Sequence, residues 1–178
     1  TERQERERQL RLVNRQWKRA LRRLRERERQ FETLAENSPD VIARFDRELR
    51  HLYVNPAVEW VTGMARESFI GKSNRELGMP EELSAVWHAQ LGRVFETGER
   101  REFNFTFIDP DGRLHTYESQ LVPERGPQGQ VRTVLSLARD VTAHVELAQS
   151  LRASERLFRQ LTEHIDEVFW LTDWPMNR

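Results

Sequence analysis

Neither glycine nor proline occurs between residues 2 and 36, and this sets the first limit on the architecture of the chain. Arginine, glutamate, glutamine and leucine, all good helix formers, make up most of the segment. Apolar side chains recur every seven residues, with further ones three residues after each, which is the a/d spacing of a coiled coil. The predicted seam consists of Leu10, Val13, Trp17, Ala20, Leu24, Phe31 and Leu34, with a charged interruption at Arg27. We therefore predict a helix over residues 1–36 that forms a homodimer, in parallel orientation in the favoured interpretation.

The charge of the chain is divided unevenly between this helix and the rest. Residues 1–30 hold 12 basic and 5 acidic side chains, whereas the remainder holds 17 basic and 24 acidic ones, for a net charge of zero over 178 residues. Dense positive charge suits nucleic acid or an anionic membrane surface. Glutamates interrupt the arginines and the apolar seam already explains the segment, so no nucleic-acid partner is expected. A juxtamembrane position in a longer protein stays open as an alternative.

Several classes of protein are excluded by what the sequence lacks. It has no cysteine, which rules out disulfides, cysteine-ligated metal centres and thiol catalysis. No phosphate-binding glycine loop, HExxH motif or nucleophile elbow occurs, and the histidines show no metal-ligand spacing. We predict no catalytic residue and no metal ligand. Without a signal peptide or a bilayer-length apolar run, the expected location is the cytoplasm, with membrane attachment only through regions outside this sequence.

A second region begins where Pro39 disfavours helix at the residue before it. From Val41 the apolar period changes to two, which is typical of strands. We predict strands at 41–45, 51–54, 102–108, 113–122 and 131–140, helices at 55–63 and 81–97, and a last helix from about 142 past 158. Asn55 is predicted to cap the first short helix, with Pro56 at its first position. Mixed helices and antiparallel strands of this order predict an α+β domain.

An internal repeat indicates a second copy of this domain. A shift of 127 residues aligns segment 28–36 with segment 155–163 and carries Val41 onto Val168. Both copies lie where a helix is followed by a strand, so tandem modules are the simplest explanation. We predict a linker helix over 143–164 and the truncated start of a second module over 165–178. Since the chain begins without methionine and ends after an aromatic-rich stretch, we expect it to be a fragment of a longer protein.

A set of short motifs is spread over residues 31–142. The motifs are Asp46; Tyr53-Val54-Asn55-Pro56-Ala57 with Gly63; Ile70-Gly71-Lys72; Thr97-Gly98-Glu99; Asp109-Pro110-Asp111-Gly112; and Arg139-Asp140-Val141-Thr142. In order and spacing they resemble those of a PAS sensory domain. The resemblance implies a PAS domain over 37–142, with a five-stranded antiparallel sheet in the order 2-1-5-4-3 cupped by short helices around a pocket. It also implies flanking helices that pair into dimers and signal to an effector, often a histidine kinase or a cyclic-di-GMP enzyme.

The candidate pocket rests on alternating side chains of one strand. Phe103, Phe105 and Phe107 share a face that must be buried. By analogy with the family, this face is joined by Phe45, Tyr117, Ser119, Ser136 and Ala138. Two interpretations stay open: the side chains fill the core themselves, or they hold a small apolar or aromatic ligand near Tyr117 and Ser119. The opposite face carries Leu135 and Leu137, which suits docking of a flanking helix or a second protomer.

No cofactor is predicted for this pocket. PAS-like flavin photosensors use a cysteine, which the corresponding stretch 71–77 lacks, so a photoadduct of that type is impossible. Haem-binding PAS sensors take a histidine from the long helix. Here His88 lies about one position from the spacing of those sensors, and one step turns a side chain by about 100°. Haem and flavin are therefore not expected.

Asp140 and Thr142 lie where the last strand becomes a helix, and both residue types bond free backbone N–H groups at such starts. We interpret them as the signal relay of a non-catalytic sensory and dimerisation module from a two-component or cyclic-di-GMP protein, with its kinase or cyclase in the same chain. Binding at the pocket would shift the pairing of the exiting helix through Leu147, Leu151, Phe158 and Leu161. The alternatives are a purely structural tandem spacer and the sensory part of a transcription regulator.

Overall fold

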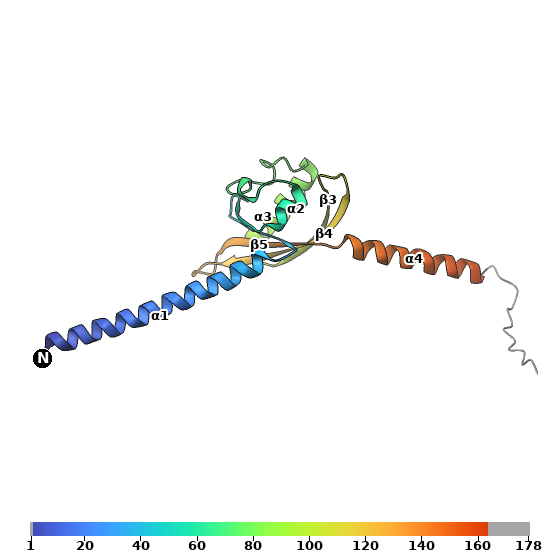
Figure 1. Ribbon diagram of the computed structural model, residues 1–178. Helices are drawn as coiled ribbons and strands as arrows, with labels where there is room; N and C mark the ends of the chain where they lie inside the picture. The colour runs from blue at the N-terminus through green and yellow to red at the C-terminus, as the bar shows by residue number, and fades with distance from the viewer. Residues whose placement is uncertain (1, 164–178) are drawn as a thin grey trace, which may run out of the picture. The chain divides into compact units, whose positions relative to one another are not determined.

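The computed structural model describes residues 2–163 and, within the first helix, the side chains of residues 16–23, 25–27, 29, 30 and 32–36. The elements are α1 (Glu2–Glu36), β1 (Val41–Phe45), β2 (His51–Val54), α2 (Ala57–Thr62), the 3₁₀ turn η1 (Arg66–Ser68), α3 (Glu81–Thr97), β3 (Arg101–Ile108), β4 (Leu114–Arg125), β5 (Val131–Asp140) and α4 (Thr142–Glu163) (Figure 1). The chain falls into two compact units that divide between Asp140 and Val141.

The five strands form one antiparallel sheet in the order β2-β1-β5-β4-β3. This confirms the predicted α+β PAS fold and its strand order. The first and last strands of the domain are neighbours, with Val41 paired to Ala138 and Phe45 paired to Val134. The strand β4 extends to Arg125, beyond the predicted end at residue 122, because its last residues pair with the start of β5. The centre of the sheet is thus built from β1, β5 and β4.

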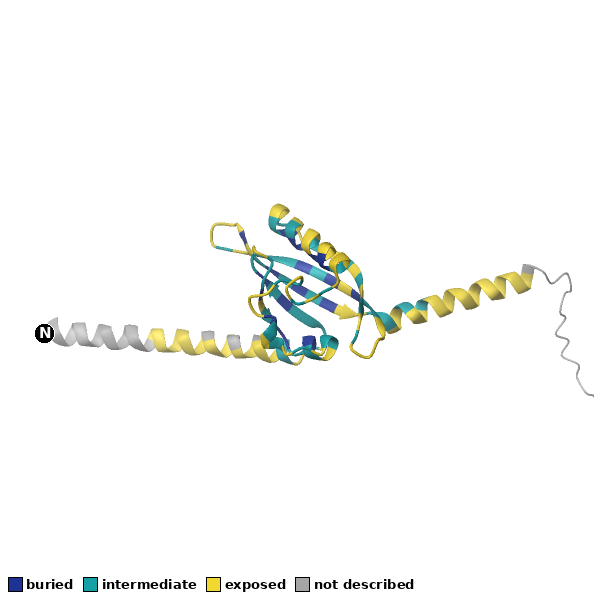
Figure 2. Ribbon diagram, turned by 90° about the horizontal axis from the view of Figure 1, so that it is seen from above, coloured by how far each residue is buried: buried dark blue, intermediate teal, exposed yellow. Residues whose placement is uncertain are grey.

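The core lies between one face of the sheet and α3. Trp87, Leu91 and Val94 follow the i, i+4, i+7 spacing of a helical stripe, and all three are buried. The outward residues of α3 are exposed, so that burial divides the helix lengthwise (Figure 2). Gly98 ends the helix in the left-handed conformation, with φ of 67° and its N–H bonded to the Val94 carbonyl. Burial of this stripe fixes α3 across the sheet.

Asn55 has a different role from the predicted one. The helix α2 begins at Ala57 and has no side-chain cap, so the prediction that Asn55 caps it is wrong. Asn55 is completely buried, accepts the Ile42 N–H (2.9 Å) and donates to the carbonyls of Ala35 (3.0 Å) and Asp40 (2.9 Å). A carboxamide can serve as donor and acceptor at once. It therefore fastens the end of α1 to the first strand instead of starting a helix.

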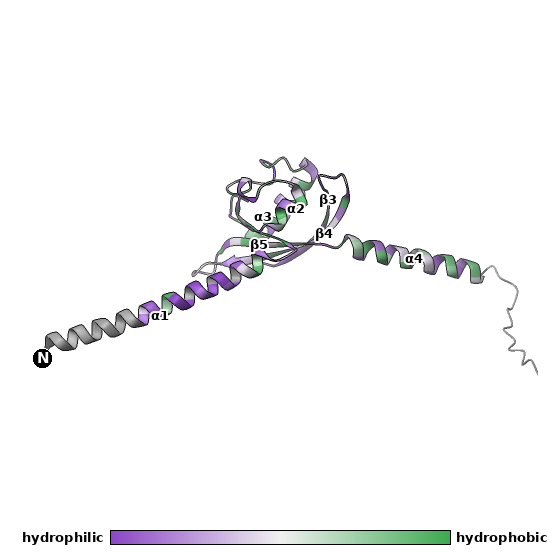
Figure 3. Cartoon of the chain, viewed as in Figure 1, coloured by the Kyte–Doolittle hydropathy of each residue, from purple (hydrophilic) through white to green (hydrophobic). Residues whose placement is uncertain are grey.

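The flanking helices leave apolar side chains in solvent. In α1, Trp17 and Leu34 are 72% and 71% exposed, and Ala20 is exposed as well. The side chains of the remaining predicted seam residues, Leu10, Val13, Leu24 and Phe31, lie outside the described residues. In α4 the predicted stripe of Leu147, Leu151, Phe158 and Leu161 is exposed. Figure 3 shows the described part of α1 as mostly hydrophilic and α4 as alternating. The predicted second copy at 165–178 also lies outside the described residues.

No helix within residues 2–163 is both long and apolar enough to cross a bilayer.

Candidate functional site

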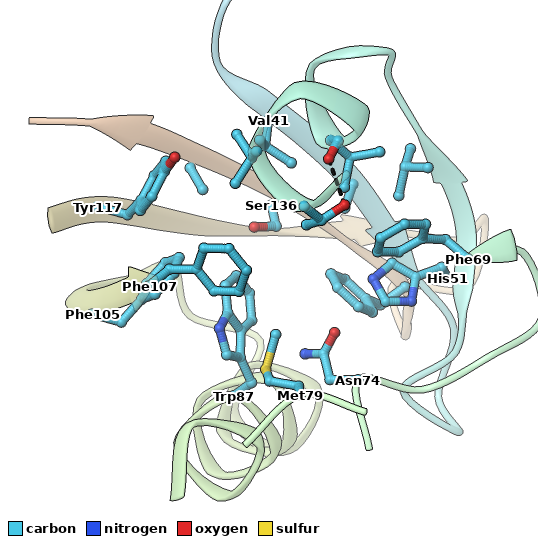
Figure 4. A pocket seen from close by; sticks show the side chains of 17 residues that line it. Val41, His51, Phe69, Asn74, Met79, Trp87, Phe105, Phe107, Tyr117 and Ser136 are labelled. Atoms are coloured by element: carbon cyan, nitrogen blue, oxygen red, sulfur yellow. Dashed lines mark hydrogen bonds between the residues drawn. The ribbon is translucent and has the colours of Figure 1, made fainter. Parts of the chain in front are cut away.

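An inner pocket of about 90 Å³ lies between the sheet and the helices that cover it (Figure 4). Six of the eight side chains predicted from the sequence line it: Phe45, Phe105, Phe107, Tyr117, Ser136 and Ala138. They come from β1, β3, β4 and β5, so that four of the five strands contribute to one wall. The remaining space shows that these side chains do not fill the core completely.

The other two predicted residues, Phe103 and Ser119, do not line the pocket. Phe103 packs edge-on against Trp87, with the ring centres 5.0 Å apart, and so supports the wall from behind. Ser119 is completely buried, and its hydroxyl lies 3.3 Å from that of Ser136. The structure thus brings Ser119 beneath the pocket instead of into it.

Tyr117 forms one end of the pocket. It stacks on Phe105, with ring centres 5.3 Å apart and planes 14° from parallel. Burial, and then the negative charges of Asp140 and Asp109, raise the pKa of Tyr117 to about 12. The phenol is therefore neutral throughout the physiological range. This end of the pocket offers a flat apolar surface without a formal charge.

His51 forms the opposite end and was not predicted. Its Nδ1 lies 2.7 Å from the carbonyl of Lys72, and its ring packs against Phe45 at 4.4 Å and Phe69 at 5.4 Å. Burial lowers the pKa of His51, although the Lys72 hydrogen bond and the charge of Asp46 act in the other direction. The neutral ring must carry its proton on Nδ1, since a carbonyl only accepts. Nε2 is left as a hydrogen-bond acceptor on the pocket side.

Sequence reasoning missed His51 because the strand is irregular. Arg44 pairs with Tyr53 but the next residue, Phe45, pairs with His51, so Leu52 is an extra residue in β2. Strict alternation would place His51 on the same face as Tyr53, which lines a recess on the outer face of the sheet. The bulge turns His51 to the inner face instead. No local sequence signal marks this bulge.

The sequence also did not predict the polar groups that Trp87 and Asn74 contribute to the pocket wall. Trp87 is only 6% exposed, and its Nε1 has no hydrogen-bond partner among residues 2–163. The helical spacing of Trp87, Leu91 and Val94 could have placed it toward the sheet. Asn74, from the segment before α3, turns its carboxamide into the pocket (Figure 4). Nothing in the irregular 64–79 stretch indicates that orientation.

A wider outer recess of about 550 Å³ lies next to the inner pocket. Both are lined by Thr62, Phe69, Asn74, Met79 and Phe107. The recess is bordered by the loop before α3 and by the end of β3, where Ile108 is 62% exposed. Unbranched Met79 can change rotamer at low cost. The side chains of Met79 and Phe107 therefore lie between the inner pocket and this recess.

The predicted relay residue Asp140 is bonded to a histidine. His115 places Nδ1 2.7 Å from Asp140 Oδ2 and Nε2 3.1 Å from Asp109 Oδ2. Hydrogen bonds to Asp140 and then to Asp109 raise the pKa of His115. Only the protonated ring can donate from both nitrogens. His115 thus joins the β3–β4 turn to the last residue of β5, next to Thr142, the first residue of α4.

The residues considered for a cofactor or metal lie apart. His88 is exposed on α3 and borders a different surface recess from the inner pocket. Within residues 2–163 no three histidine or carboxylate side chains group as a metal site would require. A haem ligated by His88 would therefore lie outside the inner pocket.

Comparison with known proteins agrees with this geometry. Residues 35–146 match the family described as PAS fold. The methanogenesis regulatory histidine kinase FilI of Methanothrix harundinacea is 25% identical over 130 residues, which are 73% of this chain and 14% of that protein. The chain spans less than a third of the length of each curated relative that it matches.

Solved structures of similar fold include a receptor and an isolated PAS domain. The VqmA dimer of Vibrio cholerae, described as a DNA-binding receptor, superposes with a TM-score of 0.58 at 25% identity, over 65% of this chain and 52% of that one. The PAS domain of an HTR-like protein from Haloarcula marismortui gives a TM-score of 0.54 at 28% identity, over 69% and 98%. The family match covers more than half of the chain, and this protein therefore belongs to the PAS family of sensory modules.

Proposed function

We propose that this chain is the sensory and dimerisation module of a signal-transduction protein, in which occupancy of the inner pocket changes how α4 pairs with a second copy. The observation that carries the proposal is the position of β5. Ser136 and Ala138 of this strand line the pocket, and Asp140, two residues later, is the last residue before Val141 and α4. A displacement of the pocket wall therefore acts on the strand that leads directly into the exiting helix.

Exposed apolar side chains on both flanking helices support the dimer. Leu34 of α1 borders a recess of about 600 Å³ on the outer face of the sheet, together with Ile42 and Leu135. Leu147 and Phe158 of α4 are each 70% exposed. A monomer would leave these apolar stripes in water, at roughly 25 cal/mol for each Å² that pairing would bury. Seam and outer-face residues thus favour a second protomer as the partner.

The effector of such a module is a kinase, a cyclase or a DNA-binding domain. The kinase relative FilI and the receptor VqmA represent two of these classes. Each effector responds to the geometry of a dimer, and the inner pocket and β5 would serve either in the same way. Signalling through a flanking helix is favoured over a purely structural spacer because Ser136 and Ala138 put a cavity wall on the strand that leads out.

One experiment tests both the dimer and the relay. The native sequence has no cysteine, so a single Gln149→Cys substitution on α4 gives one spin label for each protomer. Double electron–electron resonance then measures the distance between the two labels. Replacing Ala138 with Leu should partly fill the pocket, and we expect it to shift the distance distribution while the fold is retained by circular dichroism.

The matched control is Leu24→Glu, which puts a charge into the predicted α1 seam and should remove the dipolar signal without unfolding the domain. Absence of any dipolar signal in the parent protein would contradict the dimer. Identical distance distributions with alanine and leucine at position 138 would contradict the relay and support the spacer.

A further inference from the structure

The inner pocket has an uneven distribution of polarity that limits what it can hold. None of the side chains that line it carries a formal charge at neutral pH, given the neutral ring of His51. Most of the wall is aromatic or aliphatic, with the rings of Phe69, Trp87 and Phe107 prominent (Figure 4). An ionised ligand would lose its hydration there without a compensating charge. The occupant must therefore be neutral and largely apolar.

Two polar atoms of the pocket wall are available for hydrogen bonds with a ligand. The Nε2 atom of His51 is an acceptor, because Nδ1 donates to the Lys72 carbonyl. Trp87 Nε1–H is a donor with no partner in the described part of the chain, on a side chain that is 94% buried. A buried donor without a partner destabilises the folded protein, and a ligand that accepts from it removes that cost. Both side chains pack against the same ring, Phe45, at 4.4 and 6.1 Å.

The size of the pocket limits the ligand further. A dry apolar cavity of roughly 150 Å³ accommodates benzene in another protein. The inner pocket, at about 90 Å³, is smaller, but only side chains such as Met79 and Phe107, which line both spaces, separate it from the outer recess. A single ring fits with a modest rotation of these two side chains, whereas a fused or long ligand does not. Parallel rings such as Tyr117 and Phe105 favour a flat occupant.

We propose that the inner pocket binds a neutral, single-ring aromatic molecule whose hydroxyl or ring N–H donates to His51 Nε2, with an acceptor atom that takes the indole N–H of Trp87. This inference rests on the proposed sensory function and gives its ligand a chemical class. His51 and Trp87 select the polar group, and the surrounding phenylalanines hold the ring. Asn74 lies at the entrance and supplies a further hydrogen bond to a ligand that carries a second polar group.

Phenol and toluene form a matched pair of probes, because they have the same size and only phenol has a hydroxyl. Isothermal titration calorimetry on the whole chain should give phenol a dissociation constant about five to ten times lower than that of toluene. Benzoate, which carries a charge, should not bind. In ¹⁵N spectra the indole resonance of Trp87 and the Nε2 resonance of His51 should shift clearly farther with phenol than with toluene, because only phenol forms hydrogen bonds there.

Variants with matched controls locate the effect. His51→Phe should abolish the preference for phenol, whereas His88→Phe, at an exposed histidine outside the pocket, should keep it. Trp87→Phe and Trp60→Phe form a second pair, since Trp60 is 75% exposed. If His51→Phe does not fold, the unchanged protein still decides the question through the two probes and the Nε2 resonance.

Equal affinity for phenol and toluene, or no binding of either at about 10 mM, would overturn the proposal. Binding of phenol without a change in the His51 Nε2 resonance would overturn the proposal as well. None of these results involves the distance between α4 helices, so failure of the ligand class is distinguishable from failure of the dimer or the relay.

Discussion

The inner pocket and the end of β5 each hold a histidine, and the two surroundings shift the histidine pKa in opposite directions. His51 is 4% exposed, lies among aromatic rings and has its pKa lowered by burial. His115 lies between two carboxylates, and its hydrogen bonds with Asp140 and Asp109 raise its pKa. One environment disfavours the charged ring and the other favours it. The same side chain therefore offers an acceptor at the pocket and two donors at the exit.

The difference is consistent with the proposed function, in which the pocket senses and the end of β5 transmits. Polar atoms at the pocket, the Nε2 of His51 and the Nε1 of Trp87, keep capacity for a ligand. At the exit, His115 is paired on both sides, and Arg139 bonds Asp40 at 2.9 Å, which ties the end of β5 to the start of β1. Satisfied groups hold their geometry, whereas unsatisfied ones respond to an incoming partner. In the proposed function, the pocket wall would respond to a ligand and the end of β5 would pass the change to α4.

The largest expected effect comes from a substitution in the wall of the inner pocket. Trp87→Ala removes a buried indole from the core, and we expect the free energy of unfolding to fall by about 3–5 kcal/mol. Its matched control, Trp60→Ala, removes an indole that is 75% exposed and should change stability by about 0.5 kcal/mol or less. Urea denaturation followed by circular dichroism measures both. Equal losses for the two variants would show that Trp87 is not part of the core.

A second prediction concerns pH, where the two histidines should act with opposite sign. The folded pKa of His51 is lowered, so its contribution to stability is present above the unfolded value of about 6.5 and is lost as the pH falls. The folded pKa of His115 is raised, so its contribution is present below about 6.5 and is lost as the pH rises through the raised value.

We expect His51→Phe to reduce the loss of folding stability that occurs as the pH falls. His115→Gln should remove a contribution to folding stability that is present only at low pH. The side chains of His115 and Asp140 are 26% and 41% exposed, so solvent screening limits the second effect to about 0.5–1 kcal/mol. Chemical denaturation from about pH 5.5 to 8.5 measures both variants, with His88→Gln as control. If both substitutions changed the pH dependence of folding stability in the same direction, the comparison would be contradicted.

The fold was predictable because its boundary signals are local. Gly98 ends α3 at the predicted residue, and Asp109-Pro110-Asp111-Gly112 forms the turn before β4, with Gly112 donating to the Asp109 carbonyl at 3.0 Å and a φ of 81°. Such signals act within four residues of each other. The alternating phenylalanines of β3 also identify most of the pocket wall, since side chains of a regular strand alternate between faces.

The polar part of the site was not predictable, because it depends on contacts between distant segments. His51 reaches the pocket through a bulge, and Asn55 bonds Ala35, twenty residues earlier, instead of capping the next helix. The pairing of His115 with Asp140 needs the register of β4 on β5, which no single strand encodes. Sequence patterns thus indicate which face of an element is buried but not which polar groups meet there.

The smallest effect on stability is expected at the exit, where the comparison predicts a large effect on transmission. Replacing Asp140 and Thr142 with alanine removes the His115 partner and a residue suited to begin α4. Loss of a helix cap costs about 1 kcal/mol, and loss of a half-exposed ion pair costs less. We expect the melting temperature to fall by only a few degrees, since about 1 kcal/mol corresponds to roughly 2–8 °C in a domain of this size.

The same double variant should uncouple α4 from the pocket, because about 1 kcal/mol is comparable to the free energies that couple distant sites. With the label at position 149, the change in distance caused by Ala138→Leu should shrink or disappear in this background. His115→Gln, which removes the histidine and leaves Thr142 in place, separates the ion pair from the helix start. If the distance change persists undiminished in the double variant, the exit contacts hold the strand end only, and β5 transmits through its pairing with β1 and β4 alone.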